Sequence, residues 1–402
     1  MPRFSRLHVV ALAFYALIAY ILLNPLITHS GTQVAGFDYF NYNWNFWWIR
    51  HALTTPGLSI YESNFVFFPT DNNLGYHALT LFWYPLWAVF EPLLGSLTTI
   101  NLIIYFGCLL NGYLLFVLLV DEGVKPGIAL IGGAVLQTLP IARYFYYNTH
   151  LNLMDWFWLP AFLLLWKQIA KAAAARHLPR LLAWSLVTAL AVWGVGLTDL
   201  QFPIFTGFVI VPYGLLTLWR ARRDRPQLIR LIGAGLLAVG VGAALLWVAG
   251  PLPHMLTFIG TLAPGPAEER PGIPFPQGFL TMHELWWNWD TPSTGAFVTL
   301  VTLLALVVAL RQRKHVRDRW FWFFVALPPL ILAMGPTLWI GELEIPLPFR
   351  LMHGLTDGMF RMPWRLAPIF VVAAMLFAGK TLSAWPPLTR PGMRRFAALT
   401  AA

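Results

Sequence analysis

The chain has 402 residues, of which 58% are hydrophobic and only 11% are charged. A soluble domain carries roughly 25% charged residues, so this composition excludes an ordinary soluble enzyme and predicts a polytopic membrane protein. The formal net charge of +10 does not indicate a nucleic-acid partner, because excess Lys and Arg in membrane proteins gathers in cytoplasmic loops. The single cysteine, Cys108, excludes a disulfide framework and a cysteine-based metal site.

Apolar segments recur along the whole chain. Crossing ~30 Å of hydrocarbon at about 1.5 Å per residue takes about 20 residues. We therefore expect an all-α polytopic fold with about ten transmembrane helices. The candidate spans are residues 7–27, 97–120, 128–142, 151–166, 181–197, 200–219, 228–249, 296–310, 320–338 and 366–384. The first has no convincing cleavage site and is interpreted as a retained helix, not a signal peptide.

The first outer loop opens with residues 36–53, GFDYFNYNWNFWWIRHAL. Aromatic residues recur there at helical spacing, at Phe37, Phe40, Trp44 and Trp47. Such a helix is too polar to cross a bilayer and too aromatic to leave one, so we expect it in the membrane interface. Asp38 stands at its start and is the leading candidate for chemistry; a helix N-cap is the alternative role for it.

Residues 77–94 are apolar but contain Pro85, Glu91 and Pro92. If this segment crossed, the basic loops 167–180, 220–230 and 311–319 would all be external, against the positive-inside rule. We therefore expect a re-entrant or interfacial segment here and a cytoplasmic N-terminus.

The resulting organisation is one transmembrane domain over residues 1–385, followed by a cytoplasmic tail at 386–402. Within the domain, residues 28–96 form the first outer loop with its interfacial helices, and residues 250–293 form an outer cap.

This topology places the unusual polar residues on the outer side. Ionisable groups at span ends are costly unless they are paired or face water, so they are candidate site residues. The candidates are Asp38, His77, Arg143, Asn148, His150, Asn152, Asp199, Gln201, Arg361 and Arg365, together with the aromatic Trp44. Structural roles remain open for some of them. Arg361 and Arg365 could snorkel to the interface, Arg143 could be a cation–π anchor, and Asp155 could pair with a neighbouring helix.

A set of outer segments resembles a known family. It comprises the acid opening the first outer loop, the aromatic helix, FFPTDNNLGYHALT, a segment ending in LLG, Asn-Thr-His-Leu-Asn-Leu at 148–153, and Arg-Met-Pro-Trp-Arg at 361–365. Their order resembles the C-type fold (GT-C) integral membrane glycosyltransferases, which include protein O-mannosyltransferases and aminoarabinose transferases. The resemblance covers most of the chain as an arrangement of segments, although the local motifs are degenerate.

The resemblance implies a transferase that uses a polyprenyl-phosphate sugar on the outer face of the membrane. The low cysteine count and the lack of organelle signals favour a prokaryotic inner (plasma) membrane. Asp38 matches the position of the family's catalytic carboxylate, which would deprotonate the acceptor hydroxyl. The leaving phosphate would be bound by Arg361, Arg365, Arg143 or His150. The substrate cavity would then include Asn148, Asn152, Asp199, Gln201, Trp44 and His77. The expected partners are the lipid-linked sugar and membrane lipids, with no nucleic acid.

Two departures from the family narrow these expectations. Metal-dependent members carry Asp-x-Asp in the first loop, whereas this chain has Asp38-Tyr39-Phe40, so we expect no cofactor and no divalent metal. Many relatives also carry a soluble C-terminal domain, whereas only the short tail at 386–402 is expected here after the last span. Acceptor recognition is therefore expected in the loops or from a protein partner. The alternative functions are a non-catalytic subunit of a membrane complex and a transporter of lipids or lipid-linked sugars.

Overall fold

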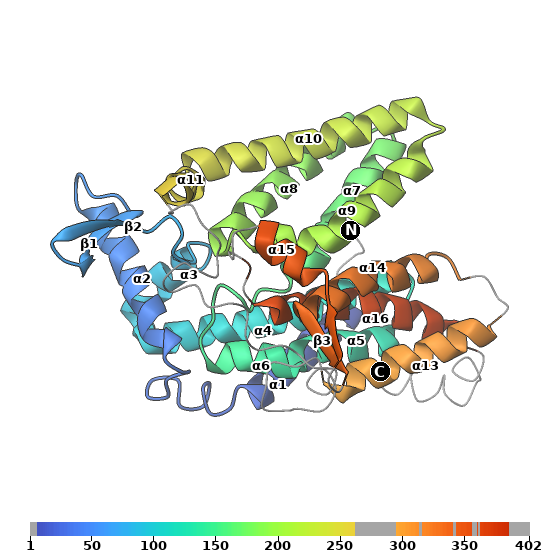
Figure 1. Cartoon of the computed structure of the whole chain (residues 1–402), viewed down its shortest axis with the longest axis horizontal. Coiled ribbons are helices and arrows are strands. Elements are labelled where there is room, and N and C mark those ends of the chain that lie inside the picture. The colour runs from blue at the N-terminus through green and yellow to red at the C-terminus, as the bar shows by residue number, and fades with distance from the viewer. Residues whose placement is uncertain are drawn as a thin grey trace. The chain divides into compact units, whose positions relative to one another are not determined.

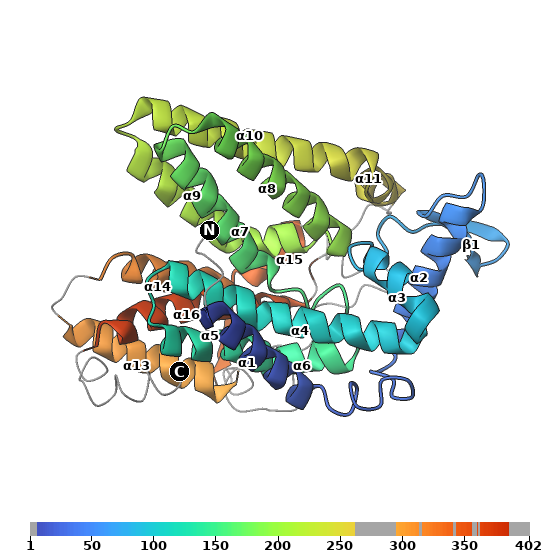
Figure 2. The same ribbon diagram turned by 180° about the vertical axis from the view of Figure 1, so that it is seen from behind.

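The computed structural model describes residues 6–261, 295–312, 316–340, 343–355, 360 and 362–385. The chain forms two compact units, which Figures 1 and 2 show from opposite sides. Unit 1 consists of Met1–Leu22, Gly107–Phe145 and Ala263–Ala402, and unit 2 of Leu23–Phe106 and Tyr146–Leu262. Most of the expected outer cap at 250–293, and the whole tail at 386–402, lie outside the described residues.

Unit 1 is built around α16. Its elements are α1 (Arg6–Leu22), α5 (Pro126–Thr138), α13 (Ala296–Arg311), α14 (Arg319–Ala333), α15 (Phe349–Leu355), the 3-10 helix η2 (Pro363–Leu366) and α16 (Ala367–Ser383). The chain passes between the units within α4 (Ser96–Asp121) and α6 (Pro140–Tyr147). Because α16 packs on α5, α13 and α14, it is buried along almost its whole length (Figure 1).

Unit 2 contains a bundle of four antiparallel helices. Its elements are α2 (Asp38–Thr54), α3 (Tyr84–Leu94), α7 (Trp158–Ala174), α8 (Leu178–Thr198), α9 (Phe202–Ala221), α10 (Arg225–Val248) and α11 (Leu252–Thr261). Helices α7 to α10 pack against one another (Figure 2). The Asp224 side chain caps α10 by accepting from the Gln227 amide, 3.0 Å away. A Cβ on Gly242 would lie 2.6 Å from Val192, so this glycine lets α10 approach α8 closely.

Several helices are long and apolar enough to cross a membrane. Within the described part of the chain they number five, namely α4, α8, α9, α10 and the continuous Pro363–Ser383 segment of η2 and α16. Helices α5 and α6 would count as a sixth if their bent pair forms one span, and the apolar helices α1, α13 and α14 are shorter. The protein is therefore an all-helical membrane protein in its main architecture, as its composition predicts.

Four expected spans differ from the helices observed. The segment 128–142 is broken at Leu139 with a bend of 46°, because Pro140 disfavours helical backbone in the residue before it. Helix α1 ends at Leu22, shortly before Pro25, and not at residue 27. Helix α14 ends at Ala333 and not at 338, close to Gly335, whose φ is +92°. Helix α7 starts at Trp158, because residues 151–157 form turns and irregular backbone.

Two short antiparallel hairpins in the described residues are absent from the expected all-α fold. They pair β1 (Glu62–Phe67) with β2 (Thr70–Asn73), and β3 (Thr337–Ile340) with β4 (Leu343–Pro346). The first follows α2 in unit 2 and is held to it where the Trp48 indole donates to the Ile60 carbonyl at 3.1 Å. Strands of four to six residues are too short to give a clear alternating pattern of apolar and polar residues, so the sequence does not predict them.

Helix α3 lies against α2 and is too short to cross a bilayer by itself. Its 11 residues extend ~17 Å at the helical rise. The Arg50 guanidinium of α2 pairs with Glu91 at 2.8 Å and lies 4.3 Å from the centre of the Trp87 ring. This arrangement agrees with the expectation that residues 77–94 do not form a span.

In unit 2, the basic loops after α7 and after α9 lie at the same end of the bundle. The Arg230 side chain of α10 donates to the Ala173 carbonyl at 3.3 Å, and Arg176 lies 3.9 Å from Asp224.

In unit 1, the ends of α4, α13 and α16 lie together in the same way. Lys380 pairs with Glu122 at 2.8 Å, and Gln312 donates to the Thr381 carbonyl at 3.4 Å. Among the described residues, the helix ends that border basic segments therefore lie together within each unit, the grouping that the charge pattern predicts.

Candidate functional site

The start of α2 is pressed onto the turn that follows α6, within unit 2. Gly36 has φ +65°, and a Cβ there would lie 2.8 Å from the Asn148 Cα, so only glycine permits this approach. The Thr149 hydroxyl donates to the Ala35 carbonyl. Asp38 is the first residue of α2, and Phe37 occupies the N-cap position without a side-chain cap. Asp38 therefore does not have the N-cap role considered for it.

This contact brings Asp38 and His150 together. Asp38 Oδ2 lies 2.6 Å from His150 Nδ1, and the two side chains are 42% and 21% exposed. An ionised carboxylate only accepts hydrogen bonds, so the imidazole proton in this pair sits on Nδ1. The pair combines a partly exposed carboxylate with a fixed donor, which is the arrangement that a positioned general base requires.

A hydrogen-bonded chain runs from α2 to the end of α8, one helical turn below Asp38. The Tyr42 hydroxyl donates to Asn152 Oδ1, and Asn152 Nδ2 donates to Asp199 Oδ2 at 2.7 Å. Asp199 Oδ1 accepts from the backbone N–H of Gln201 at 2.8 Å. Burial, with smaller effects from the nearby Asp38 and Asp199 charges, raises the pKa of Tyr42, which therefore stays a neutral donor.

A second group lies further along α2. His77 Nε2 lies 2.8 Å from Asn45 Oδ1, and Asn45 Nδ2 donates to the Ala78 carbonyl at 3.0 Å. The Trp44 ring meets His77 edge-on at 6.4 Å and stacks on Trp48 at 6.0 Å. Burial lowers the pKa of His77, so its imidazole is neutral at pH ~7. Trp44 and His77 thus lie together, and Asn45 orients the imidazole.

The aromatic stripe predicted on α2 is largely its exposed face. Phe37, Phe40 and Trp47 are exposed, whereas Tyr42, Phe46 and Ile49 are among the buried residues. Aromatic side chains that face outward from a membrane protein are suited to the headgroup region of a bilayer.

Unit 1 carries the arginines predicted to bind the donor phosphate. Arg143 is exposed on α6, and Arg365 is partly buried in η2. Within this unit the two segments pack together, because Trp364 stacks on Phe145 at 5.4 Å and meets Tyr144 edge-on at 5.8 Å. Arg361 lies outside the described residues.

Asp155 is a fully buried carboxyl group close to this site in unit 2. Its Oδ2 accepts from the Trp83 indole at 2.8 Å, and its Oδ1 lacks a hydrogen-bond partner among the described residues. Burial raises the pKa of Asp155 well above its ordinary value, with the Trp83 hydrogen bond acting in the opposite direction. Asp155 therefore holds the turn before α7 against the start of α3, which agrees with the structural role considered for it, pairing with a neighbouring helix.

The raised pKa predicts that Asp155→Asn stabilises the protein more at neutral than at acidic pH. In the unfolded chain the Asp155 carboxyl group ionises near pH ~3.9, whereas in the folded protein it stays protonated to higher pH. The stability of the wild type therefore falls as the pH rises above ~3.9. The asparagine does not titrate, and its amide oxygen can still accept from Trp83. Thermal unfolding of both proteins in lipid nanodiscs at pH ~4.5 and ~7.5 tests this. A difference in Tm that does not change with pH would contradict it.

Sequence reasoning did not select Tyr42, Asn45 and Trp83 as site residues. Tyr42 stands four positions after Asp38, and Asn45 three positions after Tyr42. This spacing places Asp38, Tyr42 and Asn45 on one face of the helix, so the sequence contained a pattern from which Tyr42 and Asn45 could have been predicted. Trp83 offers no such pattern, because its role depends on a carboxyl group far along the chain.

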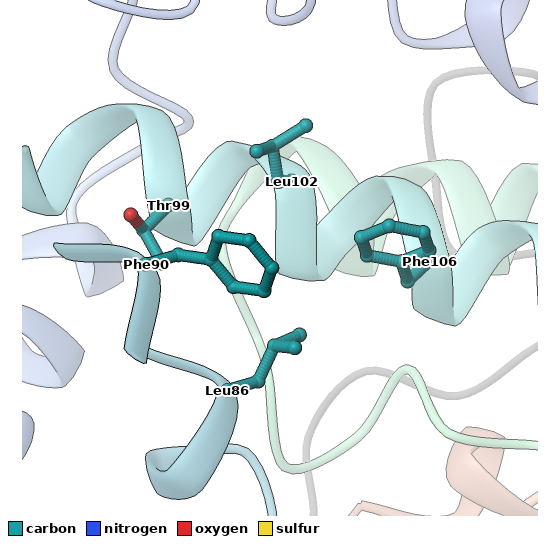
Figure 3. Close-up of a pocket in the computed structure, with 5 residues that line it drawn as sticks. All are labelled: Leu86, Phe90, Thr99, Leu102 and Phe106. Carbon is teal, nitrogen blue, oxygen red and sulfur yellow. The ribbon is translucent and has the colours of Figure 1, made fainter. Parts of the chain in front are cut away.

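An apolar cavity of about 80 Å³ lies between α3 and α4 in unit 2 (Figure 3). It is lined by Leu86, Phe90, Thr99, Leu102 and Phe106. The Thr99 hydroxyl already donates to the Gly95 carbonyl at 2.9 Å. Pockets for small polar ligands are usually several hundred Å³ (~300–1,000 Å³) and present convergent polar groups, so this cavity suits a hydrocarbon segment and not a sugar.

Comparison of the chain with models of protein families, with curated proteins and with solved structures finds no match. The class of protein therefore follows from the fold alone. The described residues define a membrane-embedded, predominantly helical protein with a polar cluster around Asp38 in unit 2.

Proposed function

We propose that this protein is a membrane glycosyltransferase that moves a sugar from a polyprenyl-phosphate donor to an acceptor hydroxyl. The observation that carries the proposal is the Asp38–His150 pair, a partly exposed carboxylate fixed at the start of an aromatic helix in a membrane protein. A carboxylate at the start of a helix in the membrane interface can meet an acceptor from the water and an amphiphilic donor from the bilayer.

Asp38 acts as the general base of an inverting displacement. It accepts the proton of the acceptor hydroxyl while the hydroxyl oxygen attacks the anomeric carbon of the donor sugar. The bond from that carbon to the phosphate oxygen breaks, and the lipid phosphate leaves with the electron pair. The products are an inverted glycoside, a polyprenyl phosphate and a protonated Asp38, which returns its proton to water.

The donor phosphate is bound by arginine, whose planar guanidinium can pair with two phosphate oxygens. Arg143 and Arg365 are the candidates for this role among the described residues, and both belong to unit 1. The apolar cavity between α3 and α4 suits part of the lipid chain. No cofactor or divalent metal is part of the proposal, since the first loop has Asp38-Tyr39-Phe40 in place of Asp-x-Asp.

The active site belongs on the outer face of a prokaryotic inner membrane, with about ten spans and a cytoplasmic N-terminus. Supporting this orientation, the described helix ends that border basic segments lie together within each unit, and the positive-inside rule assigns such ends to the cytoplasm. The aromatic face of α2 then lies in the interface on the opposite side. Acceptor recognition lies in the loops or is supplied by a protein partner.

The test is sugar transfer from a panel of radiolabelled polyprenyl-phosphate sugars. Membranes contain wild-type protein or Asp38→Asn at equal abundance. Label that reaches an acceptor with the wild type but not with the variant supports a transferase centred on Asp38. Equal transfer by both removes the role of Asp38. Absence of transfer from every donor, with native membrane acceptors present, favours the non-catalytic subunit instead.

A further inference from the structure

We infer that His150 is a positioning residue for Asp38 and not a ligand of the donor phosphate. This inference rests on the proposed function, but it reassigns a residue that the sequence pattern places among the phosphate-binding cations. The contact between Asp38 Oδ2 and His150 Nδ1, at 2.6 Å, is the observation from which it starts.

The hydrogen bond determines what each atom of the pair can do. Nδ1–H is the donor, because the ionised carboxylate of Asp38 can only accept. With Oδ2 held in this way, Oδ1 of a partly exposed side chain is the oxygen that meets an acceptor hydroxyl. A hydrogen bond to one carboxylate oxygen thus sets the direction in which the other accepts a proton.

The backbone around His150 is fixed before any substrate binds. Its carbonyl accepts from the amides of Leu153 and Met154, at 2.9 Å and 3.1 Å. The preceding residue, Thr149, has φ +55° and is tied to the Ala35 carbonyl. The Gly36–Asn148 contact closes the same region from the side of α2. Imidazole and carboxylate are therefore held on two segments that are themselves locked together, as preorganisation requires.

Charge argues against a phosphate at this imidazole. A carboxylate already lies 2.6 Å from Nδ1, and a second anion bound to the same ring would be repelled at close range. The Tyr42 hydroxyl, which is a neutral donor, lies within electrostatic range of both Asp38 and Asp199, so Asp199 adds negative charge to this region. The surroundings of His150 favour a neutral hydroxyl over a second anion.

During transfer the proton of the acceptor hydroxyl passes to Asp38 Oδ1, while His150 keeps its own proton and stays bonded to Oδ2. The imidazole thus takes no proton and touches neither the anomeric carbon nor the phosphate. Its removal is expected to impair the reaction step and to leave donor binding unchanged.

The test compares His150→Phe, which removes the donor, with His150→Asn, whose amide N–H can occupy the place of Nδ1–H. The full-length protein in nanodiscs is assayed with the donor that the panel identifies. We expect His150→Phe to lower kcat about 10²-fold with KM for the donor unchanged, and His150→Asn to regain at least about tenfold of that loss. The Kd of undecaprenyl phosphate should match the wild type in both variants. His29→Phe, at an exposed histidine, is the matched control.

Each other outcome has a definite meaning. If KM and the Kd of undecaprenyl phosphate rise while kcat is retained, His150 binds phosphate and the inference is wrong. Full activity of His150→Phe alongside an inactive Asp38→Asn overturns the inference but leaves the proposed function intact. If wild type and Asp38→Asn transfer equally, the proposed function fails, and with it any role in positioning Asp38.

Discussion

Replacing Asp38 with asparagine is expected to lower sugar transfer by ~10²–10⁴-fold, the contribution typical of a positioned general base. The amide is nearly isosteric, and its oxygen can still accept from His150 Nδ1. It cannot take up the proton of the acceptor hydroxyl, so the loss should appear in kcat. Initial rates with the identified donor, measured at equal protein abundance in nanodiscs, provide the measurement.

The matched control for this variant is Asp71→Asn, the same substitution at an exposed acid of β2 in the same loop. It should transfer sugar at the wild-type rate, because Asp71 lies on the hairpin and not at the start of α2. Asp38→Glu is a second informative variant, since it keeps the base but moves it by one methylene. A rate for Asp38→Asn within a few-fold of wild type would show that another group takes the proton.

Replacing Lys380 with methionine is expected to destabilise unit 1 by ~3–5 kcal/mol, because it removes the cation that pairs with the buried Glu122 carboxylate. Nζ lies 2.8 Å from the Glu122 carboxylate and 2.9 Å from its carbonyl oxygen. The two side chains are only 9% and 8% exposed. Reversible unfolding in mixed micelles measures the loss.

The double variant Lys380→Met with Glu122→Leu distinguishes the loss of the ion pair from the cost of leaving one of its charges buried. Replacing both partners by apolar side chains is expected to recover most of the lost stability, because the buried carboxylate is removed together with its cation. Lys171→Met, at an exposed lysine in the last turn of α7, should change stability by no more than ~0.5 kcal/mol. A similarly small effect of Lys380→Met would show that water reaches this pair.

Helix breaks were predictable to different degrees. The bend at Leu139 follows from Pro140, a local effect that single residues reveal. The late start of α7 does not, because residues 151–157 run without a break into the apolar sequence of the helix. Their side chains Asn152 and Asp155 bind Asp199 and Trp83, partners far away in the sequence, while the backbone makes turn hydrogen bonds such as Leu153 N–H to the His150 carbonyl.

The amino-acid sequence by itself determined the membrane class, most helical segments and the aromatic face of α2, and it singled out Asp38 as a candidate. These follow from composition and from periodicity within one element, which short-range geometry controls. Only the tertiary structure decided that His150 pairs with Asp38, that Tyr42 reaches Asn152, and that Asp155 is buried against Trp83. Such contacts join segments far apart in the chain, and a residue's partner there depends on how whole helices pack. The identity of the side chains alone therefore does not specify them.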